Sequence, residues 1–171
     1  MATTATLDTA TMREYAKYLQ QAPAIAREEM TAAVEEVLNL WEREVKEKTP
    51  HGATDVLRGS IAHQLQGSPV EISGKVFSSA AHAAPVELGT RPHWVGREGF
   101  LSLRDWVQKK LGVGPGEADG VAMAVAFKIS QHGTEGAHMF ARTLEEQGAA
   151  ANEIVARAVT RIVERLNQVP G

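Results

Sequence analysis

Residues 30–45, MTAAVEEVLNLWEREV, decide the fold class of this 171-residue chain. Apolar side chains recur in this stretch in steps of three or four residues: Met30, Val34, Val37, Trp41 and Val45. Such spacing is typical of one face of an amphipathic helix, which other elements must cover. We therefore expect the Trp41 side chain to be buried. The helix should end at Thr49-Pro50, because the residue before a proline is disfavoured in the α region.

Shorter patterns precede this helix. Residues 1–7 are rich in alanine and threonine, and we expect them to be loose. Asp8 is a candidate N-cap of a first short helix, with Leu7 and Met12 placed as a hydrophobic staple. Pro23 fits the first turn of a second helix, where its missing N–H is tolerated.

After Pro50 the pattern changes from helix to strand. Residues 60–66 and 70–78 are predicted as two strands of an antiparallel hairpin, with a turn at 67–69. A further element is expected at 84–88. Because two strands alone are only marginally stable, the hairpin needs a helix or more strands packed against it.

Helical patterns return in the second half of the chain. Ser102, with Asp105 three residues later as a capping box, should begin one helix, and Gly112 should end it. A turn is expected at 114–116. A helix of small residues is then predicted over 117–132, with Val121, Val125 and Ile129 on one face and Gly133 as its stop.

The C-terminal part, residues 139–166, is predicted as one long helix. Gly148 weakens it, and its apolar stripe consists of Ile154, Ala158, Ile162 and Leu166. Together these elements predict an α+β fold that is mostly helical. A small antiparallel sheet should pack against long N- and C-terminal helices, in a single domain of residues 1–171.

Composition excludes several classes of function. The net charge is −3 and the isoelectric point is near 6.1, and no basic stripe is present to neutralise phosphates. The chain has no cysteine, which removes disulfides and thiol chemistry. The N-terminus lacks a secretory pattern, and no apolar run approaches the ~20 residues that span a bilayer. We expect synthesis and assembly in a cytoplasm, without a membrane partner.

Residues capable of catalysis do not form a known motif. None of the six histidines pairs with another at helical spacing or in H-E-x-x-H. Ser60 follows Gly59 without a G-x-S-x-G context, and residues 112–116 lack the lysine of a phosphate-binding loop. The acidic pairs 28–29, 35–36 and 145–146 are predicted to be solvated helix faces. We expect no enzymatic activity, no metal and no cofactor.

Three blocks carry a family resemblance. Thr49-Pro50 is followed by LRGSI at 57–61, by PVELGTRPH at 85–93 and by GTEGAHMF at 133–140. Their order resembles the minor tail proteins of long-tailed bacteriophages that complete the tail or form the head–tail connector (neck). Leu88 stands where that family usually has an aromatic residue, and 53–55 replaces a commoner Asp-Thr-Gly. The resemblance covers about residues 35–165, and 100–132 matches a helical insertion also seen in the transposable-phage branch.

The resemblance implies a structural virion protein that completes or terminates the tail and joins it to the head. It implies a homo-oligomeric ring, with six copies suggested by tail symmetry, and contacts with other tail and head–tail connector proteins. DNA would pass through the lumen without specific binding. The expected location is the tail or neck of the virion, after assembly in the host bacterial cytoplasm.

The block at 85–93, together with the Trp94 that follows it, gives the candidate intersubunit contacts. They combine a glycine turn, a proline, a fork-shaped cation and an aromatic ring, the last two being types enriched at interface hot spots. The candidates are Glu87, Gly89, Thr90, Arg91, Pro92, His93 and Trp94. Arg91 could pair with Glu87 or with a carboxylate on a neighbouring copy. The alternative interpretation is a turn that serves only its own fold.

Two other functions stay open. A tail-tube subunit is a different structural role in the same particle, but tube subunits are typically richer in β-structure. A histidine-ligated metal hydrolase is an enzymatic alternative, for which stoichiometric bound metal would be the sign.

Overall fold

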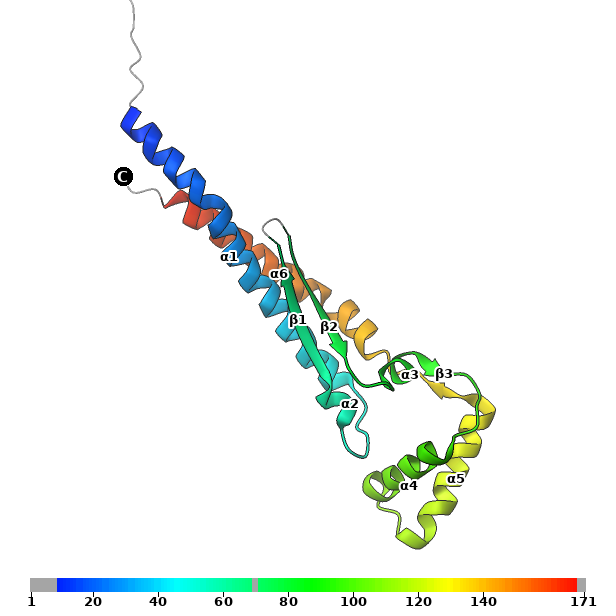
Figure 1. Ribbon diagram of the computed structural model, residues 1–171. Coiled ribbons are helices and arrows are strands. Elements are labelled where there is room, and N and C mark those ends of the chain that lie inside the picture. Colours follow the sequence, from blue (N-terminus) through cyan, green and yellow to red (C-terminus); the bar gives the residue numbers. More distant parts are fainter. Residues whose placement is uncertain (1–8, 69–70, 169–171) are drawn as a thin grey trace, which may run out of the picture. The chain divides into compact units, whose positions relative to one another are not determined.

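The computed structural model describes residues 9–68 and 71–168, and it is 69% helical. Its elements follow in the order α1 (Thr9–Lys48), α2 (Val56–Gly59), β1 (Ile61–Gly67), β2 (Ile72–Ser78), α3 (Ala83–Leu88), β3 (Gly89–Thr90), α4 (Arg97–Leu111), α5 (Pro115–His132), β4 (Thr134–Glu135) and α6 (Met139–Asn167) (Figure 1). The predicted α+β class is confirmed, with its small antiparallel hairpin and long terminal helices. In the described ranges no helix is both long and apolar enough to span a bilayer.

The N-terminal helices predicted on either side of Pro23 are instead one helix. α1 runs through Pro23, whose exposed ring lies inside the helix and not at its start. A helix can continue past a proline where its neighbours re-satisfy the freed carbonyl or water does so. Residues 1–8, with the proposed N-cap Asp8 and the staple residue Leu7, lie outside the described residues, as does the Met12 side chain.

The chain divides into two compact units. One consists of residues up to Asn39, Gln64–Lys75 and the chain from Gly148 onward. The other consists of Leu40–His63 and Val76–Gln147. α1 and α6 each contribute residues to both units.

In the first unit, the α1 and α6 segments lie side by side and antiparallel, as the blue and the orange-to-red ribbons show (Figure 1). Their buried residues are Ala33, Val37, Leu38, Ala151, Ile154 and Ala158. β2 comes so close to α1 that a Cβ at Gly74 would overlap the Leu38 side chain. The predicted stripe of α6 is therefore correct at its centre, whereas Ile162 and Leu166 are only half-buried.

In the second unit, the core joins distant parts of the sequence. Val45, Leu57, Ile61 and Met139 are buried together, and Val76, Ala80, Ala83, Val86 and Phe140 pack around them. Leu57 and Ile61 come from the LRGSI block. Ser60 of the same block shares a hydrogen bond with Ser78, and their hydroxyl oxygens lie 2.7 Å apart. The residues that carry this part of the resemblance thus build the core.

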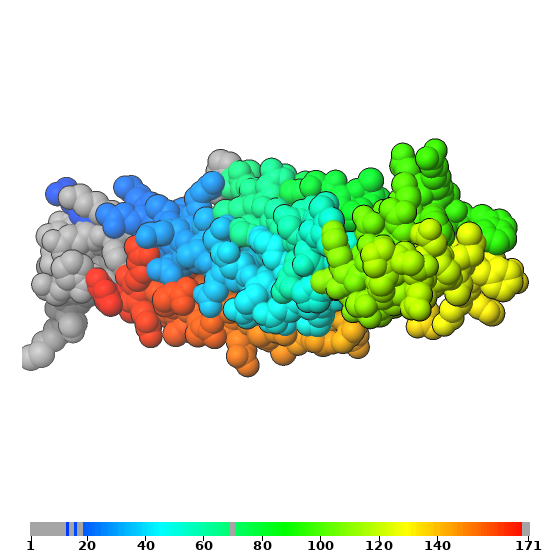
Figure 2. Space-filling model, turned by 90° about the horizontal axis from the view of Figure 1, so that it is seen from below, coloured from blue at the N-terminus to red at the C-terminus, as the bar shows by residue number. Residues whose placement is uncertain are grey.

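α4 and α5 form a helical hairpin with a core of its own. Val107 packs against Ala118 and Ala122, whose small side chains allow close approach. The green-to-yellow atoms of this hairpin lie next to one another in the space-filling view (Figure 2). Two boundaries differ from the prediction. α4 begins at Arg97 and not at Ser102, whose hydroxyl donates to the Glu98 carbonyl inside the helix. Pro115 lies in the first helical turn of α5, and not in a separate β-turn before the helix. Proline is tolerated at this position because its missing N–H would have no partner within the helix.

Trp41 departs from the expected full burial. Its side chain is only half-buried, although its Nε1 atom is inaccessible and has no hydrogen-bond acceptor among the described residues. The size of an indole explains the difference, since a single layer of neighbours rarely covers it completely. Ala33, Leu38 and Val45, on the same helix, are almost completely buried.

Candidate functional site

Two of the blocks singled out in the sequence, 85–93 and 133–140, meet in space. β3 and β4 pair antiparallel, with Gly89 opposite Glu135 and Thr90 opposite Thr134. Beyond this ladder, the Ala137 N–H donates to the Val86 carbonyl at 2.8 Å and the His138 N–H to the Glu87 carbonyl at 3.1 Å. We call this pairing of residues 86–91 with 133–141 the clamp. The clamp thus joins two segments that lie more than 40 residues apart in the sequence.

Glycines at the clamp let two backbones approach more closely than side chains would permit. Gly89 has φ +76° and Gly133 has φ +72°, both with ψ near the extended value, a conformation that is essentially restricted to glycine. A Cβ at Gly89 would overlap the Thr134 carbonyl oxygen, and one at Gly133 would overlap that of Thr90. Gly136 faces the Glu87 carbonyl in the same way.

Glu87 caps a helix from a distance in the sequence. Its two carboxylate oxygens accept hydrogen bonds from the backbone N–H groups of Phe140 and Ala141, each at 3.1 Å. These N–H groups lie in the first turn of α6, where they have no partner within the helix and where the helix dipole favours an anion. Glu87 is one of the two partners expected for Arg91, but its carboxylate is engaged by these N–H groups and does not pair with Arg91.

The second half of the predicted contact segment faces solvent. Arg91, Pro92, His93 and Trp94 are all exposed, and the only side-chain hydrogen bond within them runs from the His93 ring to the Arg91 carbonyl, at 2.9 Å. Trp94 is 68% exposed and lies against Phe127 of α5, which is 57% exposed, with ring centroids 6.4 Å apart and planes tilted by 59°. Glu87, Gly89 and Thr90 thus serve the chain's own fold, while Arg91 to Trp94 remain available for contact.

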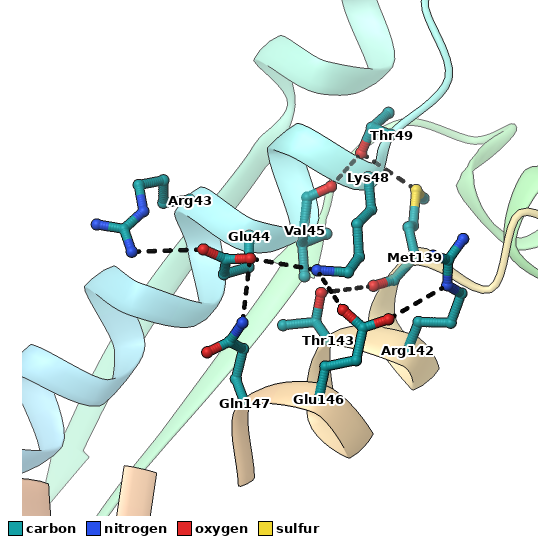
Figure 3. A network of polar contacts seen from close by, with 10 residues as sticks. All are labelled: Arg43, Glu44, Val45, Lys48, Thr49, Met139, Arg142, Thr143, Glu146 and Gln147. Carbon is teal, nitrogen blue, oxygen red and sulfur yellow. Dashed lines mark hydrogen bonds and ion pairs between the residues drawn. The ribbon is translucent and has the colours of Figure 1, made fainter. Parts of the chain in front are cut away.

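A polar network in the second unit is not predictable from local sequence patterns (Figure 3). Lys48 at the end of α1 bonds Glu44 at 3.2 Å and Glu146 of α6 at 3.1 Å, and Gln147 donates to Glu44 at 3.2 Å. The hydrogen bond from Lys48 lowers the pKa of Glu44, and although burial opposes it, pairing with Glu146 and Glu44 raises the pKa of Lys48. The network ties α1 to α6.

Below this network, the Thr49-Pro50 turn is anchored by its threonine. Thr49 is buried, its hydroxyl donates to the Val45 carbonyl at 2.6 Å, and it lies 3.2 Å from the sulfur of Met139. Thr143 repeats the pattern on α6 by donating to the Met139 carbonyl at 2.8 Å (Figure 3). The predicted end of the helix at this turn is confirmed.

Acidic pairs predicted as solvated faces are partly engaged. Glu29 of α1 accepts from Arg161 at 2.7 Å and from Arg165 at 2.8 Å, and these two hydrogen bonds, that from Arg161 first, lower its pKa. Arg165 also bonds Glu28, and Arg157 bonds Glu36 at 3.1 Å. Their partners lie more than 100 residues away, so local spacing could not identify them.

The histidines are scattered. His63 is half-buried, with its Nδ1 2.5 Å from Glu42, whose pKa is lowered first by Lys46 and then by His63. The others, His51, His82, His93, His132 and His138, are exposed. In the ranges 9–68 and 71–168, no three His, Asp or Glu side chains gather as metal ligands would.

Comparison with known proteins adds no relative: no family model matches the sequence, and no match is found among curated proteins or solved structures. The functional argument therefore rests on the residues of this chain, its clamp and its exposed surfaces.

Proposed function

We propose that this chain is a non-enzymatic structural subunit of a long-tailed bacteriophage, placed at the end of the tail or at the head–tail junction, and that it acts as a homo-oligomeric ring. The ring would complete or terminate the tail and join it to the head connector. Six copies are proposed from the symmetry of such tails. DNA would pass through the lumen without being read.

The observation that carries the proposal is the exposed aromatic pair of Trp94 and Phe127. Aromatic rings are costly to leave in water, and Trp is among the residues most enriched at interface hot spots. Leu88, on the clamp, is 73% exposed as well. A contact with another protein would remove these groups from water, as assembly requires.

The clamp supports the same proposal through rigidity. It fixes the chain by backbone hydrogen bonds directly before the exposed segment, so Arg91 to Trp94 start from a fixed end and lead into α4. A preorganised contact segment loses less conformational entropy when it binds than a free loop does. Repeated around a closed cyclic ring, such a contact would be made once per subunit.

Sedimentation velocity of the full chain over a range of concentrations tests the ring, and complementation of a phage that lacks this gene tests its place in the particle. We expect a discrete closed oligomer and restored tailed particles. A protein that is monomeric at every concentration, and absent from purified virions, would refute the proposal. One tightly bound metal ion per chain after dialysis would instead favour the hydrolase alternative.

A further inference from the structure

The Trp94–Phe127 pair belongs to a larger apolar surface. Met123, one turn before Phe127 on the same side of α5, is 53% exposed. We call Trp94, Met123 and Phe127 the aromatic patch. Gly120 and Ala124 of α5 are exposed beside them, so no long side chain covers this side of the helix.

The two segments that carry the aromatic patch contain cationic side chains, and the acidic Glu98, Asp119 and Glu135 lie directly outside them. Residues 91–97 and 120–134 include two arginines, a lysine and two histidines, and no acidic residue. Arg91, Arg97 and Lys128 are exposed, and none of them has an ion-pair partner in the part of the chain that the structure describes. The aromatic patch is thus bordered by cations that remain free.

A second apolar surface lies on α6, opposite the side that packs on α1. Ala149, Asn152, Ala156, Val159 and Val163 recur in steps of three and four and are all exposed. Val159 and Val163 are 49% and 50% exposed, whereas Ile154 and Ala158 on the packed side are buried. We call these five residues the outer face of α6. A surface helix usually carries charged residues on such a face.

The free charges beside the outer face are negative. Arg157 and Arg161 are held by Glu36 and Glu29 of α1. Glu153 and Glu164 are exposed and have no ion-pair partner within the described residues. This surface and the aromatic patch are therefore both apolar, and they are bordered by charges of opposite sign.

We infer that the aromatic patch of one subunit docks on the outer face of α6 of the next copy of this chain. Contact between two aromatic patches would bring free cations together, and contact between two outer faces would bring free carboxylates together. Only the mixed contact pairs unlike charges, and such a head-to-tail contact closes into a ring when its rotation permits. The inference rests on the proposed ring and names the two surfaces that build it.

Cross-linking tests this pairing, and the absence of native cysteine makes engineered thiols unambiguous. Lys128→Cys and Glu164→Cys chains are treated with a flexible bis-maleimide, separately and after mixing. We expect covalent dimers in the mixture and in a chain that carries both substitutions, but not in either single variant alone. Lys109→Cys, at the exposed end of α4, replaces Lys128→Cys in the control and should give none.

Charge reversal provides a second measurement. Glu153→Lys with Glu164→Lys should weaken self-association by about tenfold, because cations would then meet cations. Adding Arg97→Glu and Lys128→Glu to the same chain should restore it. Lys109→Glu with Lys110→Glu is the matched control and should change nothing.

The outcomes separate this inference from the function on which it rests. Oligomers that form normally, without the mixed cross-link and without rescue, would overturn the pairing and leave the ring in place. Cross-links of the Lys128→Cys variant with itself would mean that patch meets patch, which also overturns the pairing. A chain that never self-associates, alone or in virions, would overturn both.

Discussion

Glu87 shows how one side chain can hold two distant parts of the sequence together. Its carboxylate accepts two N–H groups at the start of α6, more than 50 residues later in the chain. His138 precedes the helix and has φ +50°. Among the described residues, its side chain makes no capping hydrogen bond. The first turn of α6 therefore depends on a residue of α3.

The first prediction concerns this cap. Glu87→Ala should lower the free energy of unfolding by about 1–2 kcal/mol, because two N–H groups lose their acceptor and the helix dipole loses an anion. Urea denaturation followed by circular dichroism measures the change. Glu135→Ala, an exposed acid of the same clamp, is the control and should stay within about 0.5 kcal/mol of the parent protein. Equal effects of the two substitutions would contradict the role of Glu87.

Two glycines should respond in opposite directions to the same substitution. Gly89→Ala should destabilise the protein by roughly 2 kcal/mol or more, because its φ is positive and the added methyl group overlaps the Thr134 carbonyl. Gly148→Ala should stabilise it by about 0.5–1 kcal/mol, since this glycine lies inside α6 with open space around it. Thermal melts of both variants compare the signs, and two shifts of the same sign would contradict this account.

Residues differ in how far the sequence could predict them. Gly112 and Gly133 were predictable as helix stops, because a C-terminal glycine acts through its own backbone. The cap by Glu87 and the ion pairs of Glu29 were not, because their partners are set by tertiary structure and leave no local spacing. Within the candidate contact segment, the sequence could not separate Glu87 to Thr90, which belong to the clamp, from the exposed Arg91 to Trp94.

At the scale of elements, the strongest polar links join the α1 and α6 segments of the first unit. Arg157, Arg161 and Arg165 follow one another at helical spacing and reach Glu36, Glu29 and Glu28 in antiparallel order. Arg165 bridges both acids of its pair, which raises the pKa of its guanidinium, chiefly through Glu29. The ladder fixes the register of two helices whose apolar contacts include small, featureless alanines.

The third prediction is an acid dependence of this ladder. The folded pKa of Glu29 lies below its unfolded value of about 4.3, so the unfolded chain binds more protons and stability rises with pH. The stabilisation is fully present above the unfolded pKa and is lost as pH falls through the lowered folded pKa. Glu29→Gln should therefore melt below the parent at pH 7 and together with it near pH 2.

Glu47→Gln is the control for that series, because Glu47 is exposed and unpaired within the described residues, so its melting curve should follow the parent at every pH. A gap between the melting temperatures of Glu29→Gln and the parent that stays constant from pH 7 to pH 2 would show that the carboxylate charge contributes nothing.

The existence of the helices was predictable from periodicity, whereas the single uninterrupted α1 was not, because the environment of Pro23 lies outside the local pattern.

At the scale of the whole molecule, net charge limits the affinity of the protein for a polyanion such as DNA. The total is −3, and the free cations beside the aromatic patch are few. A protein that neutralises about three phosphates has a weak, strongly salt-dependent affinity for duplex DNA. This suits the proposed ring, whose lumen would have to let DNA move.

The fourth prediction is therefore weak DNA binding. An electrophoretic shift assay at physiological salt should show no complex with duplex DNA at low micromolar protein. Binding below micromolar concentration that falls steeply with added salt would contradict it, and would require a basic surface formed on assembly.

The clamp has a consequence for the chain's modularity. Thr90 and Thr134 are direct strand partners, so the two ends of the segment between them lie next to each other. The α4–α5 hairpin has its own core, and none of its residues joins the core around Val45 and Met139. We therefore expect that residues 91–133, here called the cassette, can be replaced as a unit. Replacing them by Asn-Gly, the preferred two-residue hairpin turn, should leave a chain that still melts cooperatively, whereas a non-cooperative product would show that the cassette is integral. A different segment could then be inserted between Thr90 and Thr134 without repacking the core around Val45 and Met139.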